Sequence, residues 1–247
     1  MQRLKVVTLN IHKGLSHFNR RMVIHELRDG LRDLNPDVVF LQEVQGLNQR
    51  YALRYAGCPG PQHEFLAGTH WQHVYGRNAV YDHGHHGNAI LSRFPFVSSV
   101  NQDVSDHRYE RRGLLHSVVS VPGWWRNLHC VCVHLSLHER GRNRQLEAIS
   151  GRLEEIASRD VPIIVAGDFN DWRHRATAIL ERRLGLTEVS VAQHGRAART
   201  FPSLLPFLQL DRIYVRGFSV AASSVHRGKP WSMLSDHLAV SAELERG

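Results

Sequence analysis

The 247-residue sequence contains only three cysteines, which excludes a scaffold held together by several disulfides. Two of them stand in the run Cys130-Val131-Cys132-Val133-His134, which looks like a set of metal ligands. The spacing differs from that of usual zinc sites, and the run instead fits a strand whose side chains alternate between two faces. We therefore expect small buried thiols here and no zinc.

Long apolar runs are also missing. No stretch approaches the roughly 18 apolar residues of a membrane-spanning helix. No apolar leader with a small-residue cleavage site comes before the first strand-like segment. We therefore expect a soluble, cytoplasmic protein without an integral membrane segment, and a monomer.

Acidic residues are outnumbered, because 31 Lys and Arg stand against 23 Asp and Glu and give a formal net charge of +8. A basic surface favours polyanionic partners, either nucleic acid or anionic lipid head groups. A mildly basic surface with no polyanionic partner is the alternative that charge alone leaves open.

The hydrophobic content of 42% is enough for one large domain, which we expect to span residues 1–247. Strand patterns over 4–11 and 38–44 flank an amphipathic helix over 21–34, and these short connections imply parallel pairing. Residues 46–87 have no clear pattern, so we expect an irregular segment with one or two short helices. Two sheets packed face to face with helices outside fit the whole pattern. Further strands are expected over 88–92, 96–110, 113–121, 126–135, 161–168, 210–215, 218–222 and 237–244, and further helices over 143–158 and 174–184.

The strand over 161–168 ends abruptly in Gly167-Asp168-Phe169-Asn170. Glycine lets the backbone turn sharply, and the turn then presents a carboxylate and an amide at the end of the strand. The carboxylate can orient a water, and the amide can donate hydrogen bonds to a charged oxygen. An Asx-rich turn that merely closes a core strand is the alternative.

Polar side chains stand at the ends of several other apolar segments. One such residue is usually a cap, but carboxylates gathered at one end of a sheet repel each other unless a cation is present. Because these ligands offer oxygen and no cysteine is placed to join them, they favour Mg²⁺ or Mn²⁺ over zinc. A cation, an activated water and donors to a charged oxygen are the components of phosphoester hydrolysis. The polar residues are Asn10, Glu43, His134, Asp168, Asn170, Asp211, Asp236 and His237.

In their order along the chain these segments resemble the endonuclease/exonuclease/phosphatase superfamily, the deoxyribonuclease I-like proteins, and especially small bacterial members that begin with Asn-Ile-His-Lys-Gly. Each motif is weak alone, but the ordered set covers nearly the whole chain and is specific. The resemblance implies an α/β fold, a four-layer α/β/β/α sandwich of two mixed sheets, with the site at one end of the sheets. The motifs are Thr8-Leu9-Asn10, Leu41-Gln42-Glu43-Val44, Gly87-Asn88-Ala89-Ile90-Leu91-Ser92-Arg93, Val133-His134-Leu135, Arg144-Gln145, Gly167-Asp168-Phe169-Asn170, Leu210-Asp211-Arg212-Ile213 and Ser235-Asp236-His237.

By this resemblance, Glu43 is the main Mg²⁺ ligand, assisted by Asn10 and Asp236. His12 stands where some members carry a second acidic ligand, so we expect one metal ion rather than two. Asn88 and Arg112 are weaker candidates for phosphate contacts, since a turn amide and a surface arginine explain them equally well.

The resemblance also implies the catalytic groups. Asp211 orients His237, and this pair handles the proton of the attacking water, with Asp168 as the other candidate base. Asn170 and His134 stabilise the pentacoordinate phosphorus.

We therefore expect a Mg²⁺-dependent phosphodiesterase, with DNA or RNA as the first substrate class. A phosphoesterase for a phospholipid or small-molecule head group is the alternative, because Trp124-Trp125 at a hairpin tip would suit a membrane interface. A non-catalytic binding module on the same fold is disfavoured because the set of catalytic residue types is complete.

Overall fold

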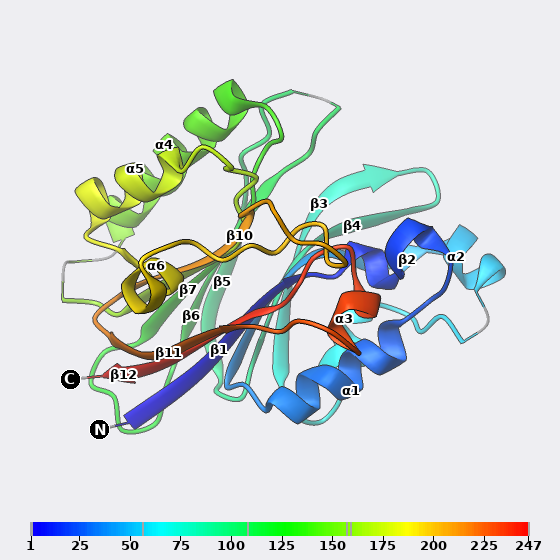
Figure 1. Ribbon diagram of the computed structural model, residues 1–247, viewed down its shortest axis with the longest axis horizontal. Coiled ribbons are helices and arrows are strands. Elements are labelled where there is room, and N and C mark those ends of the chain that lie inside the picture. The colour runs from blue at the N-terminus through cyan, green and yellow to red at the C-terminus, as the bar shows by residue number, and fades with distance from the viewer. Residues whose placement is uncertain (1, 56, 108, 157, 159, 247) are drawn as a thin grey trace.

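Two six-stranded mixed sheets form the centre of the computed structural model, which describes residues 2–246 except 56, 108, 157 and 159 (Figure 1). The first sheet has the strand order β11-β12-β1-β2-β4-β3 and the second has the order β5-β6-β7-β8-β10-β9. Each sheet contains one parallel pair, β1 with β2 and β7 with β8, among antiparallel pairs. The parallel pairing expected between the first two strands is confirmed.

The strands of the first sheet are β1 Gln2–Asn10, β2 Val38–Asn48, β3 Gln72–Tyr81, β4 Gly84–Ser92, β11 Ser219–Val225 and β12 Val240–Arg246. Those of the second sheet are β5 Phe96–Asp103, β6 Gly113–Val119, β7 Leu128–His134, β8 Ile163–Asp168, β9 Thr187–Glu188 and β10 Asp211–Arg216. The α-helices are α1 Ile24–Leu34, α2 Gln49–Arg54, α3 Gln62–Ala67, α4 Glu139–Ile156, α5 Arg175–Leu184, α6 Val189–His194 and α7 Trp231–Leu234, and the 3-10 helices are η1 His12–Gly14 and η2 His17–Asn19.

Helices cover the outer face of each sheet, so the four-layer sandwich is confirmed. Apolar residues of α1, α3 and α7 pack on the outer face of the first sheet. Those of α4 and α5 pack on the outer face of the second sheet. None of the helices within the described residues is both long and apolar enough to cross a membrane.

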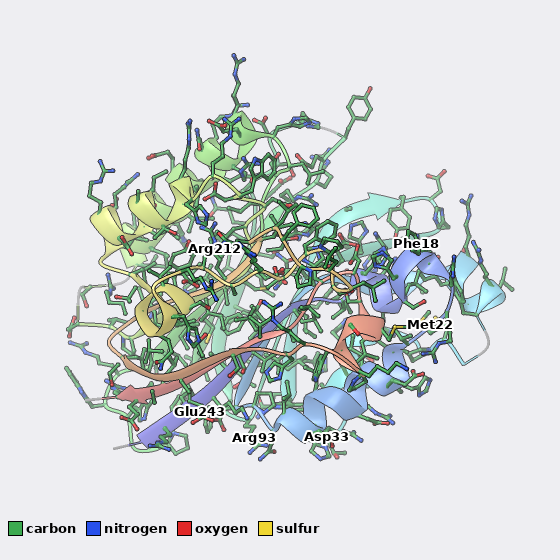
Figure 2. The ribbon with its side chains drawn as sticks, viewed as in Figure 1. Phe18, Met22, Asp33, Arg93, Arg212 and Glu243 are labelled. Atoms are coloured by element: carbon green, nitrogen blue, oxygen red, sulfur yellow. The ribbon has the colours of Figure 1, made fainter. Side chains whose placement is uncertain are left out.

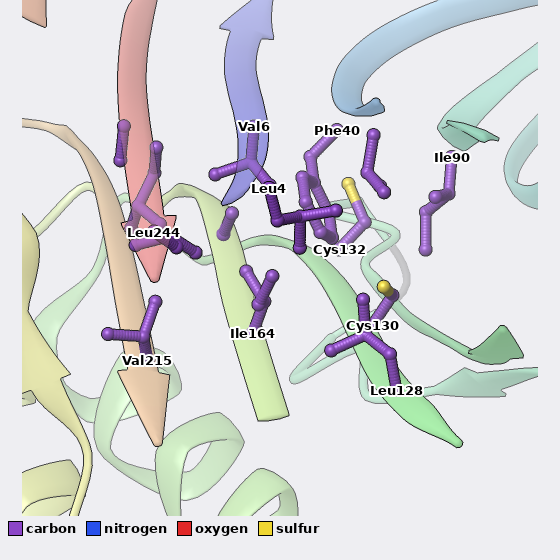
Figure 3. Packing of buried hydrophobic residues seen from close by; sticks show 14 of the residues in the cluster. Leu4, Val6, Phe40, Ile90, Leu128, Cys130, Cys132, Ile164, Val215 and Leu244 are labelled. Carbon is purple, nitrogen blue, oxygen red and sulfur yellow. The ribbon is translucent and has the colours of Figure 1, made fainter. Parts of the chain in front are cut away.

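The main core lies between the two sheets, as Figure 3 shows. Leu4 and Val6 of β1 point into it, whereas Val7 and Leu9 point outward under the helices, because strand side chains alternate between faces. Both faces of the central strands, such as β2, β7 and β8, are therefore buried, which explains the continuous apolar runs in the sequence. Cys132 also lies in this core, and burial raises the pKa of its thiol to about 12. The expectation of a buried thiol at this position is confirmed.

The segment over 46–87 differs from the expectation. It contains α2 and α3 as expected, but β2 continues to Asn48 and residues 72–81 form β3, paired antiparallel with β4. Most side chains of β3 are exposed or half-buried because β3 is an edge strand, so its sequence carries no apolar run. Positions 56, 108 and 157, which fall in segments considered from the sequence, lie outside the described residues.

Candidate active site

Six strands bring polar side chains to one edge of the sandwich, between the two sheets. β1, β7 and β8 contribute residues at their carboxyl ends. Asp211, by contrast, opens β10, as expected for a strand over 210–215, and Asp236 and His237 precede β12, which begins three residues later than expected. Because β10 and β12 run antiparallel to their neighbours, their amino ends reach the same edge.

The two-residue period of the strands selects the face on which these side chains lie. Each polar residue shares its face with core residues two positions away, so it points into the space between the sheets. The series that end or begin at the site are Leu4-Val6-Thr8-Asn10, Cys130-Cys132-His134, Ile164-Ala166-Asp168 and Asp211-Ile213-Val215. The site therefore continues the inter-sheet core.

Asp168 is the centre of the polar network and is almost fully buried. Its Oδ2 atom accepts a hydrogen bond from Asn10 Nδ2 at 3.2 Å, and it lies 3.5 Å from His134 Nε2 and 3.8 Å from His237 Nε2. Its Oδ1 atom accepts from the backbone N–H of Asn170 at 3.0 Å. Groups from both sheets thus meet at one carboxylate.

The turn after β8 has the geometry that its sequence indicates. Gly167 has φ +149°, and a Cβ atom there would lie 1.9 Å from the carbonyl oxygen of Val133, so only glycine fits. Asn170 itself adopts a left-handed φ of 48°. Its Nδ2 atom donates to the carbonyl oxygen of Leu135 at 3.0 Å, which holds the side chain beside β7.

His237 and Asp211 form a buried pair, with Nδ1 and Oδ2 2.8 Å apart. Burial opposes a charge on His237, but the carboxylates of Asp211 and Asp168 outweigh burial and raise the pKa of His237 to about 10. The Asp168 carboxyl behaves differently, because burial and the nearby Asp211 raise its pKa to about 6 although His237 opposes this shift. The site therefore holds a cationic imidazole beside a carboxyl group that titrates near neutral pH.

Glu43 lies within β2 rather than at its end, at a bulge between Leu41 and Val44, and has a left-handed φ of 56°. Its Oε2 atom accepts a hydrogen bond from Lys13 Nζ at 2.8 Å. Burial favours the neutral carboxyl, but the Lys13 ammonium outweighs burial and lowers the pKa of Glu43 well below its ordinary value. Left-handed non-glycine residues such as Glu43 cost conformational energy, and they often lie at functional sites.

Lys13 received no role from the sequence, although it stands in the Asn-Ile-His-Lys-Gly run. His12 and Lys13 have φ angles of 45° and 58°, so the chain coils tightly directly after β1. This coil is what brings the Lys13 ammonium to Glu43, and the ammonium also interacts electrostatically with Asp236. In the sequence, the one indication of this role is that Lys13 follows the strand ending at Asn10 with almost no intervening residues.

Asp236 lies half-buried on the other side of β1. Its Oδ1 atom lies 3.7 Å from His12 Nδ1 and 3.3 Å from the hydroxyl of Ser235. The same hydroxyl lies 2.6 Å from the carbonyl oxygen of Asn10, which ties the segment before β12 to the end of β1. The predicted ligand Asp236 is therefore linked to the predicted ligand Asn10 through one serine.

His134 is buried, and burial together with the positive charge of Arg112 lowers the pKa of its imidazole well below the usual value. A neutral His134 can donate one hydrogen bond and accept another. It therefore differs from His237, although both rings lie within 4 Å of the same carboxylate oxygen.

The two candidates for phosphate contacts lie at different depths. Asn88 is buried, and its Nδ2 atom donates to the carbonyl oxygens of Gly113 and Cys132 at 3.0 and 3.4 Å, which ties the two sheets together. Arg112 pairs with Glu110 at 3.1 Å and lines a cavity of about 330 Å³. The contacts of Asn88 fit a structural amide, whereas Arg112 borders an open space.

The chemistry of these groups fits a divalent cation. Asp168 and Asp211 offer carboxylate oxygens that lie within 4.8 Å of each other and of a ring nitrogen of His237. Within the described part of the chain, Asp211 Oδ1 is buried without a hydrogen-bond partner. Glu43 already attracts one cation, the Lys13 ammonium. Carboxylate and amide oxygens dominate the set, which is the preference of Mg²⁺ or Mn²⁺.

Comparisons of sequence and structure show which proteins this chain is similar to. Protein YbhP of Escherichia coli is 46% identical over 242 residues, which cover 97% of this chain and 95% of that protein. An endonuclease/exonuclease/phosphatase from Beutenbergia cavernae is similar in structure, with a TM-score of 0.79 and 22% identity over 100% of this chain and 72% of that one.

Two further solved structures share the fold. TDP2 of D. rerio, complexed with a single-strand DNA product, has a TM-score of 0.74 and 20% identity over 99% of this chain and 100% of that one. A mannosyl-6-phosphatase of Bacteroides thetaiotaomicron has a TM-score of 0.73 and 17% identity over 98% of this chain and 99% of that one. The model of the endonuclease/exonuclease/phosphatase family, whose members are hydrolases of phosphoesters, matches residues 7–237, so this chain belongs to that family.

Proposed function

We propose that the protein is a divalent-metal-dependent phosphodiesterase whose site is centred on Asp168. The observation that carries the proposal is the convergence of Asn10, His134, Asn170 and His237 on this one buried carboxylate. A carboxylate held in place by several fixed groups is pre-organised to bind and deprotonate a water.

Asp168 is our choice for the general base, and His237 is our choice for the cationic donor to a phosphoryl oxygen. The raised pKa of Asp168, about 6, lies close to working pH, which suits a base. The pKa of His237, about 10, keeps its imidazole protonated at neutral pH, which suits a hydrogen-bond donor to an anion and disfavours it as the base. Asp211 positions His237 and keeps it charged.

Asn170 and His134 are proposed to stabilise the charge that develops on phosphorus. Asn170 Nδ2 uses one N–H to hold the carbonyl of Leu135, which leaves its second N–H for a phosphoryl oxygen. His134 lies 3.5 Å from the same Asp168 oxygen as His237 and is neutral, so it can donate without adding another positive charge.

Glu43, assisted by Asn10 and Asp236, is proposed to hold one Mg²⁺ or Mn²⁺ ion. A bound divalent cation would neutralise charge on the phosphoryl oxygens and polarise the phosphorus–oxygen bond. The Lys13 ammonium already neutralises part of the charge on the Glu43 carboxylate. Arg112 is proposed to contact a substrate phosphate at the rim of the site. Asn88 is proposed to act indirectly, by holding the backbone carbonyls to which it donates.

Nucleic acid and phospholipid are both proposed as substrate classes. The net charge of +8 and the DNA product bound to the structurally similar TDP2 support DNA or RNA. A specific feature, the apolar hairpin described below, supports a lipid head group. The fold alone does not discriminate between them.

Parallel hydrolysis assays on plasmid DNA, RNA and anionic phospholipid vesicles test the proposal, with Mg²⁺, Mn²⁺ or EDTA. Glu43→Ala and His237→Ala should each abolish turnover of whichever substrate is cleaved while the fold stays intact. Asp33→Asn is a matched control, because Asp33 lies on the exposed face of α1, as Figure 2 shows. Near-normal metal-dependent turnover by either site variant would contradict the assigned site.

A further inference from the structure

Residues 201–208, with the sequence Phe-Pro-Ser-Leu-Leu-Pro-Phe-Leu, form an apolar hairpin, hereafter the apolar hairpin. The N–H of Leu208 donates to the carbonyl of Phe201 at 2.9 Å, and the N–H of Phe201 donates to that of Leu208 at 3.3 Å. Between these ends, Leu204, Leu205 and Phe207 expose 58%, 76% and 61% of their surface. Three large apolar side chains are thus held in water by an ordered turn, and exposed apolar groups of this kind mark interaction sites.

The apolar hairpin is attached to the candidate active site. The ring of Phe201 lies 4.8 Å from the ring of His237. The N–H of Ser203 donates to the carbonyl of Asp236 at 2.8 Å, and its hydroxyl donates to the carbonyl of Ser235 at the same distance. In Figure 1 the gold segment that contains the hairpin lies beside the red segment before β12. Any external surface on which the hairpin docks is therefore brought next to the catalytic groups.

Basic side chains border the same hairpin. Arg196, Arg199 and Arg227 line a cavity of about 860 Å³, together with Pro206 of the hairpin. No acidic residue lines this cavity, and among the described residues none of the three arginines forms an ion pair. We call these three residues the arginine collar. Their charges are available to an external anion.

We propose that the apolar hairpin and the arginine collar dock on an anionic phospholipid bilayer, and that the substrate of the site is a phosphodiester in that bilayer. Apolar side chains that enter the interface, flanked by arginines that meet anionic head groups, are the features of peripheral membrane binding. The second half of this inference rests on the proposed phosphodiesterase function. The first half, membrane docking, does not.

Nucleic acid explains this surface less well. Proteins that bind single-stranded nucleic acid stack its bases on aromatic rings. Among the three exposed side chains of the hairpin, only Phe207 has a ring. Leu204 and Leu205 gain free energy by entering an apolar phase, not by contact with a sugar-phosphate backbone. The pair Trp124-Trp125, expected from the sequence as the membrane contact, stands before β7, at the opposite end of that strand from His134, so it does not border the site.

Vesicle co-sedimentation tests the docking surface. Full-length protein is mixed with vesicles of phosphatidylglycerol and phosphatidylethanolamine, or of phosphatidylcholine alone. The hairpin variant Leu204→Ser/Leu205→Ser/Phe207→Ser removes the apolar contact without touching a buried residue. The control variant Leu53→Ser/Val97→Ser removes exposed apolar side chains of α2 and β5, away from the hairpin. A collar variant, Arg196→Gln/Arg199→Gln/Arg227→Gln, removes the charge.

We expect wild type and the control variant to bind the anionic vesicles and to bind phosphatidylcholine at least about tenfold more weakly. The hairpin variant should lose about tenfold or more in partitioning, from its lost apolar area. The collar variant should lose about a hundredfold, from three lost charges at the bilayer surface.

Three results would overturn the proposal. The first is that wild type stays in solution in the presence of anionic vesicles, and the second is that the hairpin variant binds these vesicles as well as the control variant does. The third is that the hairpin variant loses affinity for a single-stranded oligonucleotide but not for vesicles. Hydrolysis of bis(4-nitrophenyl) phosphate by wild type without vesicles is measured on the same preparation. Absence of this hydrolysis contradicts the proposed phosphodiesterase function, whereas membrane docking is tested independently by the co-sedimentation result.

Discussion

Replacement of Asp211 by asparagine removes the charge that keeps His237 protonated and changes the shape of the side chain very little. In wild type the pKa of His237 is about 10, and without the Asp211 carboxylate we expect it to fall to about its ordinary 6.5, because burial then offsets the remaining carboxylate of Asp168. At pH 8 the protonated fraction would then drop from about 99% to about 3%. If the imidazolium is the form that acts, turnover should fall at least about thirtyfold.

The pH dependence distinguishes this effect from simple misfolding. At pH 6 an imidazole with a pKa of 6.5 is about three-quarters protonated, so the deficit of Asp211→Asn should shrink to less than about twofold. The assay is the turnover number for bis(4-nitrophenyl) phosphate between pH 6 and pH 8.5, combined with a titration of the His237 ring by NMR. A deficit that stays constant across this range, or a His237 that still titrates above pH 9 in the variant, would refute the reasoning.

Three further changes probe other parts of the structure. Glu43→Gln removes the carboxylate that Lys13 neutralises, and we expect Mn²⁺ affinity, measured by calorimetry, to fall by about tenfold or more, whereas unchanged affinity would exclude Glu43 as a ligand. Arg212→Met leaves the buried Asp171 carboxylate without its ion pair, so urea denaturation should show a loss of about 3–5 kcal/mol, and a loss below 1 kcal/mol would contradict this role. Because folding raises the pKa of His237 from 6.5 to about 10, its contribution to stability is fully present below pH 6.5 and is lost as pH rises through 10. The difference in Tm between wild type and His237→Gln, measured in EDTA, should therefore be larger at pH 6 than at pH 10, and an equal difference at both would count against the assignment.

The direction and contacts of the Arg212 side chain could not be predicted from the order of the motifs. The sequence placed it inside a family motif next to Asp211, but gave it no role. In the structure its side chain points away from the site, is fully buried, and bonds Tyr214 and Asp171. Alternation along β10 explains this difference, since neighbouring residues face opposite sides of a sheet.

The buried strands were predictable because both of their faces are covered, so each is a continuous apolar run with a clear end. The edge strand β3 lacked that signal, since water covers much of it and hydrogen bonds to β4 define it. The four layers followed from the resemblance and from the outer helices. The single domain over 1–247, the cytoplasmic location and the monomeric state stay predictions.

The candidate site was predictable in its residue types and, through the family resemblance, in the pairing of Asp211 with His237, but not in its other contacts. Which carboxylate meets which histidine depends on strand direction and register, so the central place of Asp168 could not be deduced from spacing. Lys13 and the apolar hairpin escaped for a related reason. Each lies in a short connection whose position is set by backbone turns and by contacts with distant segments.

The most direct test of the proposed chemistry is the turnover of bis(4-nitrophenyl) phosphate by wild type and Asp168→Asn, with Mg²⁺, Mn²⁺ or EDTA, and with Asp33→Asn as control. We predict metal-dependent turnover by wild type and by the control, none in EDTA, and a loss of at least about a hundredfold in Asp168→Asn. Equal turnover in EDTA and in Mg²⁺, or a fully active Asp168→Asn, would contradict a metal-dependent phosphodiesterase centred on this carboxylate.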